Sequence, residues 1–121
     1  RTANYLRKDA ILQTEKLILE DVKFDAIFSQ SDSMLSGFRA AYEKNNLDAS
    51  RILSVGCDYT NEAKEAIKKG TQTASILFPL GGKKSIEVAL DILAKKNIQK
   101  HIVIPVELVT KENVEIVNPI F

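Results

Sequence analysis

Helical and extended hydrophobic patterns alternate along this chain, and the alternation limits the possible folds more than any other feature does. Three short runs are apolar at nearly every position, namely residues 24–28, 52–55 and 73–78. Before, between and after them, apolar residues recur at the three- and four-residue spacing of an amphipathic helix. Strands that are apolar throughout are buried on both faces, which is typical of a parallel sheet. The sequence therefore predicts an α/β fold, a Rossmann-like parallel sheet with helices on both faces.

The local signals predict where each element begins and ends. Helices are expected over residues 6–19, 32–44, 61–69 and 85–96, and two further strands over residues 101–104 and 106–109. Asp32 is predicted to cap the second helix, and Thr60 or Asn61 the third, because short polar side chains accept hydrogen bonds from free N–H groups at a helix start. Gly70 suits the left-handed residue that ends a helix.

Composition excludes several classes of function. The 121 residues have room for one compact domain, and 17 Lys and Arg against 16 Asp and Glu give a net charge of +1, so no nucleic-acid partner is expected. The longest apolar runs, such as Ala74–Leu80, are too short to cross a bilayer. One cysteine, Cys57, excludes a disulfide framework and a cysteine-based zinc site. With His101 the only imidazole, we expect no enzyme, no metal and no cofactor.

Polar residues follow each of the three predicted parallel strands. The first is followed by residues 29–32, with hydroxyls, an amide and a carboxylate, and the second by Gly56, Cys57 and Asp58. The third ends at Phe78 before a rigid turn. Ligands of open α/β sheets bind outside the carboxyl ends of the strands. Carboxylates that accept from hydroxyl groups, beside an aromatic face that covers C–H surface, suit a polyhydroxylated ligand.

Several of these residues also have purely structural interpretations. Asp32 is more simply explained as a helix cap. A position in the core explains Phe78 as well as a ligand-binding role does. Cys57 beside a strand is usually a small packing residue. The pair Gly81-Gly82 resembles a phosphate loop only superficially, because Leu77 stands where that motif requires glycine.

Four segments resemble type I periplasmic sugar-binding proteins, especially the ribose-binding group. They are Ala26–Met34, Ile52–Asp58, Glu65–Ile76 and Pro105–Asn113, in family order and with family-like spacing. The resemblance implies a two-lobe protein whose similar α/β halves are joined by three crossovers and close on a ligand. Residues 1–78 are then most of the C-terminal lobe without its first βα unit. Residues 79–104 cross to the absent N-terminal lobe, and residues 105–121 return.

The resemblance also carries over four ligand-binding positions. Asp58 matches the carboxylate that accepts sugar hydroxyls in the family. Ser31 stands where the ribose group usually has asparagine, Phe78 where it usually has glutamine, and Cys57 where an aromatic residue often lies. The general role is therefore better supported than any particular sugar.

The implied function is non-catalytic binding of a small sugar or related polyhydroxylated ligand, in the periplasm or otherwise outside the cytoplasm. A membrane permease of ABC transport, or a sensor protein, is the implied partner of the intact form, and its precursor is expected to carry a signal peptide. The chain starts at Arg1 rather than methionine, so we expect a processed form or a piece of a longer protein. The alternative is the effector domain of a lac-repressor-type transcription regulator. Members of that class typically carry Pro-Asp where this chain has Ala49-Ser50-Arg51.

Overall fold

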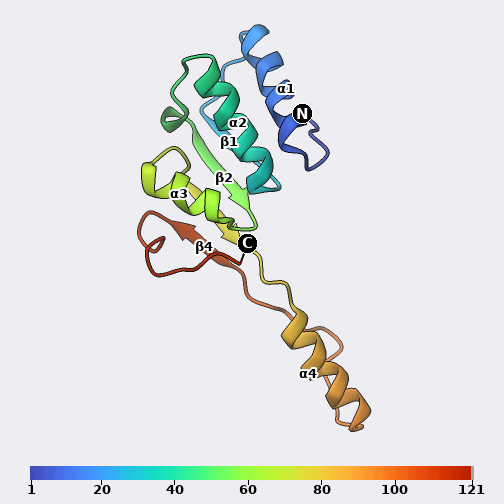
Figure 1. The fold of residues 1–121 in the computed structure, drawn as a ribbon. Helices are drawn as coiled ribbons and strands as arrows, with labels where there is room; N and C mark the ends of the chain where they lie inside the picture. The colour runs from blue at the N-terminus through green and yellow to red at the C-terminus, as the bar shows by residue number, and fades with distance from the viewer. Residues whose placement is uncertain (121) are drawn as a thin grey trace.

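Helices and strands alternate in the predicted order in the computed structural model, which describes residues 1–120 (Figure 1). The elements are α1 (Arg7–Leu19), β1 (Ala26–Phe28), α2 (Asp32–Lys44), the 3-10 turn η1 (Ala49–Arg51), β2 (Leu53–Cys57), α3 (Asn61–Lys69), β3 (Ala74–Leu77), α4 (Gly82–Leu93) and β4 (Glu107–Thr110). The cap signals around α3 are confirmed. Thr60 Oγ1 accepts from the N–H of Ala63, and Gly70 ends the helix at φ 78°.

The four strands form one sheet in the order β1-β2-β3-β4. The first three run parallel, whereas β4 pairs antiparallel with β3, opposite Leu77 at one end and Ala74 at the other. The α/β class is confirmed, and the parallel strands place their carboxyl ends along one edge of the sheet. The loops after β1, β2 and β3 therefore open on the same side of the molecule.

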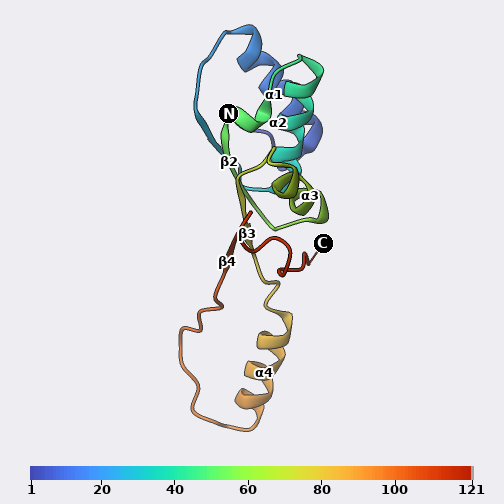
Figure 2. The same cartoon turned by 90° about the vertical axis from the view of Figure 1, so that its left-hand side faces the viewer.

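Helices α1, α2 and α3 all lie on one face of the sheet (Figure 2). Successive right-handed crossovers that advance in one direction across a sheet put their helices on the same face. Cover on both faces is predicted from the sequence, but within residues 1–120 the second face carries exposed apolar side chains. Phe28 is 64% exposed, Leu53 62% and Leu108 56%.

Two apolar clusters join the helices to the covered face. One consists of Leu35, Phe38 and Ala49, against which partly buried aromatic and aliphatic residues pack. The other joins Tyr59 and Ile67 to Val109 and Val114 from β4 and the segment after it. The second cluster fixes the residue that directly follows Asp58, so it contributes to the geometry of the candidate site.

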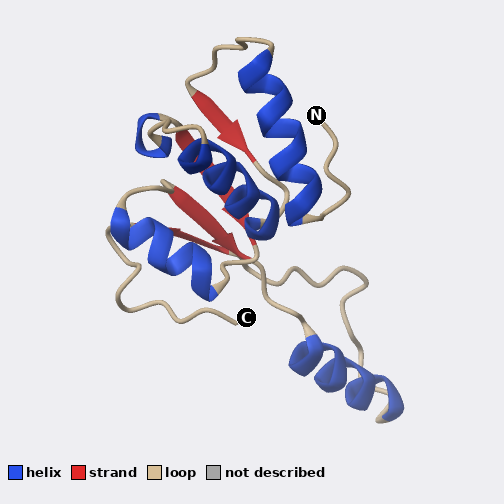
Figure 3. Ribbon diagram, turned by 45° about the horizontal axis from the view of Figure 1, so that its top comes forward, coloured by secondary structure: helices blue, strands red, loops and turns tan. Residues whose placement is uncertain are grey.

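The segment between β3 and β4 leaves the sheet (Figures 1 and 3). The sequence predicts an apolar stripe on its helix α4, formed by Ile86, Ala89, Leu90 and Leu93. The stripe is exposed in the structure, with Leu90 60% and Leu93 79% exposed. The helix begins at Gly82, three residues before the predicted start, because the N–H of Ser85 already bonds to the carbonyl of Gly81. The predicted strand at residues 101–104 is wrong. This stretch runs beside α4, away from the sheet, and has no strand partner (Figure 2).

Gly56 on β2 allows a close approach that any side chain would block. A Cβ at this position would lie inside contact distance of Asp32 Oδ1 and 2.9 Å from Asp32 Cγ. Asp32 cannot retreat, because three hydrogen bonds hold its carboxylate. Gly56→Ala is therefore expected to lower the free energy of unfolding by about 2 kcal/mol in denaturant titrations of the protein that contains this chain.

Gly82→Ala is the matched control, because a Cβ at Gly82 meets nothing within 4 Å and alanine favours the helix. Its stability is expected to be unchanged or slightly higher. Equal stability of the two variants would contradict the close contact between Gly56 and Asp32.

Candidate functional site

The four predicted ligand-binding residues all lie at the carboxyl edge of the parallel strands. Ser31 follows β1, Cys57 ends β2, Asp58 comes directly after it, and Phe78 follows β3. Backbone hydrogen bonds tie these strand ends together: the N–H of Ser29 bonds to the carbonyl of Val55 at 2.8 Å, and the N–H of Asp58 to the carbonyl of Ile76 at 2.9 Å. The structure thus gathers these loops at one edge of the sheet, as predicted.

Asp58 presents a carboxylate with no protein partner among the described residues. No hydrogen bond or ion pair reaches its side-chain oxygens within residues 1–120, although the residue is half-buried. Burial raises the pKa of Asp58, and the nearby charge of Asp32 raises this pKa further. An unpaired, partly desolvated carboxylate at a sheet edge is an open hydrogen-bond acceptor for a ligand.

Ser31 is committed to the backbone. Its Oγ accepts from the N–H of Met34 at 3.2 Å, so Ser31 is the N-cap of α2, and the prediction that Asp32 is the cap is wrong. The residue is only 6% exposed. A polar ligand group could still receive the Ser31 hydroxyl hydrogen, but the main role of this side chain in the free lobe is to start the helix.

Cys57 and Phe78 differ in how much of each side chain meets solvent. Burial raises the pKa of the Cys57 thiol, as do the charges of Asp58 and Asp32, so the protonated thiol is favoured and nucleophilic chemistry is disfavoured. Phe78 is 59% exposed, so the interpretation of its ring as a core residue does not hold within residues 1–120. The ring is free to cover an apolar ligand face.

Asp32, which the sequence predicts to be a helix cap, is instead a buried acceptor of three hydrogen bonds. It is 1% exposed, and its carboxylate accepts from the N–H of Tyr59 at 2.8 Å, from Ser75 Oγ at 2.6 Å and from Gln72 Nε2 at 2.8 Å. The only local signal was an acidic residue beside a helix start, which is ordinary for a cap. Gly56, at the strand position that faces Asp32, is a second sequence signal for this close approach.

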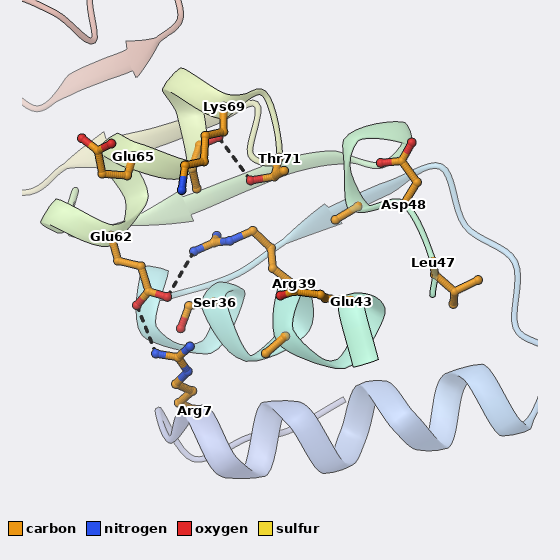
Figure 4. A pocket seen from close by; sticks show the side chains of 13 residues that line it. Arg7, Ser36, Arg39, Glu43, Leu47, Asp48, Glu62, Glu65, Lys69 and Thr71 are labelled. Atoms are coloured by element: carbon orange, nitrogen blue, oxygen red, sulfur yellow. Dashed lines mark hydrogen bonds and ion pairs between the residues drawn. The ribbon is translucent and has the colours of Figure 1, made fainter. Parts of the chain in front are cut away.

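A cavity of about 550 Å³ lies on the helix side of the sheet, away from these residues (Figure 4). It is bounded by α2, α3, η1 and the start of α1, and ion pairs cross it. Glu62 contacts Arg7 at 3.2 Å and Arg39 at 3.9 Å. None of the four predicted site residues lines this cavity, so its charges are best explained by links between helices.

Residues 1–120 give no sign of a metal centre or a membrane span. No group of three or more His, Cys, Asp and Glu side chains in this range is placed to hold a metal ion. None of the helices described in this range has the length and apolar character needed to cross a bilayer.

Comparisons with known proteins agree on one family. A model described as "Periplasmic binding protein domain" matches residues 1–97. A putative rhizopine-binding protein of Rhizobium meliloti is 29% identical over 115 residues, which are 93% of this chain and 37% of that protein. The ribose import binding protein of Bacillus subtilis is 31% identical over 114 residues, which are 93% of this chain and 36% of that protein.

A solved structure supports the same assignment. The periplasmic solute-binding protein of an ABC transporter from Actinobacillus succinogenes, with bound D-allose, superposes with a TM-score of 0.83 at 27% identity, over 95% of this chain and 41% of that one. The chain thus spans little more than a third of the length of the two curated relatives. It belongs to the periplasmic binding protein family, and both its sequence and its α/β fold match part of proteins of that family.

Proposed function

We propose that the intact protein binds a small sugar or related polyhydroxylated ligand without catalysis, outside the cytoplasm, and hands it to a membrane permease or presents it to a sensor protein. The observation that carries this proposal is the unpaired carboxylate of Asp58 at the carboxyl edge of the sheet. The names of the relatives support it, because they describe a rhizopine-binding protein, a ribose import protein and a D-allose complex. They favour a binding protein over the effector domain of a transcription regulator.

The chemistry of the edge fits a sugar. A carboxylate accepts two hydroxyl hydrogens at once, and an exposed ring such as that of Phe78 covers the C–H face of a pyranose or furanose. Cys57 adds a small, weakly polar surface beside the carboxylate. Ser31 contributes less than the resemblance implies, because its oxygen already caps α2.

The domain assignment is part of the same proposal. Residues 79–104 cross to a second lobe, and the apolar stripe of α4 packs there, while residues 105–121 return to the lobe described here. Pro79 and Pro105 flank the excursion, where strands leave the sheet and a proline costs no ladder hydrogen bond. The exposure of Leu90 and Leu93 supports this proposal.

Asp58→Ala in the intact protein is expected to weaken sugar binding by at least about 2 kcal/mol, or roughly 30-fold, because it removes a charged acceptor of ligand hydroxyls. Titration calorimetry with D-ribose and D-allose measures the change. The matched control is Asp25→Ala, an exposed carboxylate just before β1 at the opposite edge of the sheet, which is expected to leave the affinity unchanged. Unchanged affinity of the Asp58 variant would remove Asp58 from the site.

Sugar affinity is expected to fall on acidification earlier than a solvent-exposed carboxylate would allow. Burial and the charge of Asp32 raise the pKa of Asp58, so the acid form appears at a higher pH than usual, and it accepts fewer hydroxyl hydrogens. Affinity is thus full above this raised pKa and is lost as the pH falls through it. Calorimetry between about pH 7 and about pH 4 measures this step, and Asp58→Asn should abolish it. A step that persists in Asp58→Asn would assign the titration to another group.

Leu90→Ala is expected to lower the free energy of unfolding of the intact protein by about 2 kcal/mol or more, because the proposal buries this side chain in the second lobe. The control is Glu87→Ala on the same helix, whose only described partner is Lys84, and it should change stability little. If denaturant titrations give both variants the stability of the unchanged protein, α4 does not pack in a second lobe.

A further inference from the structure

We propose that Asp32 is the positioning residue of the sugar-binding loop: its buried carboxylate holds residues 57–59 so that Asp58 faces the ligand. This inference rests on the proposed function, because it concerns the same site. Asp32 does not touch the ligand in this proposal. It acts through the backbone of Tyr59, which directly follows the ligand-binding carboxylate.

The hydrogen bonds of Asp32 come from three residues in two parts of the chain, the loop after β2 and the start of β3. Oδ2 accepts from the N–H of Tyr59 at 2.8 Å and from Ser75 Oγ on β3 at 2.6 Å, and Oδ1 accepts from Gln72 Nε2 at 2.8 Å. Ser75 Oγ also accepts from the N–H of Tyr59 at 3.1 Å. The loop after β2 is thus fastened both to the start of α2 and to β3 by one carboxylate.

The loop needs such a restraint because its backbone is unusual. Asp58 has φ 96° and Tyr59 has φ 56°, in the left-handed region that non-glycine residues rarely adopt. Residues stay in such conformations only when the surrounding structure fixes them. The N–H of Tyr59 is fixed by Asp32, and its side chain is buried, with the hydroxyl donating to the carbonyl of Val117 at 3.0 Å. Together they set the direction in which Asp58 leaves the chain.

A charged network orients the amide that faces Asp32. Arg39 donates through Nη1 to Gln72 Oε1, which turns the Nε2 group of Gln72 toward the carboxylate. Arg39 in turn lies 3.9 Å from Glu62 (Figure 4). The Arg39 side chain is 11% exposed, so its positive charge lies inside the lobe, on the side of Gln72 away from Asp32.

Only a group that accepts on both oxygens satisfies these partners. All three groups around Asp32 are donors, and asparagine would place an NH₂ group against one of them. If that group faces Tyr59, the N–H of Tyr59 loses its 2.8 Å bond to position 32 and keeps only the longer bond to Ser75 Oγ, which weakens the restraint on the loop. If it faces Gln72, the amide of Gln72 must turn over, which breaks its bond to Arg39. Asp32→Asn is therefore nearly isosteric but disrupts the network in either orientation.

The test compares variants of the intact protein by titration with D-ribose and D-allose, together with hydrogen exchange of the Tyr59 amide in the ligand-free state. Asp32→Asn is expected to lose at least about tenfold in affinity while the protein remains folded at the assay temperature, with clearly faster exchange at Tyr59. Ser75→Ala, a milder change that removes one hydroxyl of the network, is expected to show a smaller loss in the same direction. It keeps the test decisive if Asp32→Asn does not fold.

Two controls separate positioning from a general loss of stability. Phe38→Leu changes the core cluster of Leu35, Phe38 and Ala49, which includes none of residues 57–59, so it should lower the melting temperature without changing affinity or Tyr59 exchange. The double variant with Asp32→Asn and Gln72→Glu transfers the negative charge from position 32 to position 72. It lets asparagine accept from Tyr59 and donate to the new carboxylate, which faces Arg39. The carbonyl of Ala74 loses the hydrogen bond that it accepts from Gln72 Nε2 at 3.0 Å, so the double variant is expected to recover affinity only in part.

Each outcome decides the proposal. Sugar affinity and Tyr59 exchange that are unchanged in Asp32→Asn would overturn it, and so would an affinity loss in Phe38→Leu as large as that in Asp32→Asn. If the unchanged protein binds neither sugar, D-ribose and D-allose are excluded as its ligands. The exchange rate of the Tyr59 amide then still judges the positioning role, and equal rates in the two proteins would refute it.

Discussion

The rest of this lobe is arranged around one buried carboxylate. Removing an ionised group from water costs several kcal/mol, and only a full set of donors offsets this cost. Asp32 obtains its donors from Tyr59, Gln72 and Ser75, which lie beyond β2 and around the start of β3. The same carboxylate also explains why β2 carries Gly56 at the point of closest approach. This carboxylate therefore ties together the sheet, the first turn of α2 and the loop of residues 57–59.

Much of the fold could be predicted from the sequence because its signals are local. Apolar runs, capping threonine and terminal glycine each act within a few residues, and they predicted the order of helices and strands and the gathering of Asp58, Ser31, Cys57 and Phe78 at one edge. A strand at residues 101–104 was predicted on the same local grounds and does not form. A strand also needs a partner to complete its hydrogen bonds, and this stretch has left the sheet.

The buried network could not be predicted from local signals. Asp32 and its three partners are separated by 27, 40 and 43 residues, so nothing within a window of one helix reveals them. In the local sequence at the start of a helix, an aspartate that is bonded by distant donors cannot be distinguished from an aspartate that caps the helix. The face on which α1, α2 and α3 lie is non-local in the same way, since it depends on the direction in which the strands follow one another across the sheet.

The exposed state of the site argues that one lobe provides only part of the binding energy. Micromolar affinity corresponds to about −8 kcal/mol, and half of that corresponds to a dissociation constant of only about 1 mM. In the open lobe, Asp58 is half-exposed and Phe78 largely exposed, so water still competes for the carboxylate and covers the ring. A second surface is needed to exclude this water, and the proposed path of residues 79–104 brings one to the same edge. Under the proposed two-lobe arrangement, ligand binding and lobe closure are one event, and a carboxylate already held in place by Asp32 adds no further ordering cost to it.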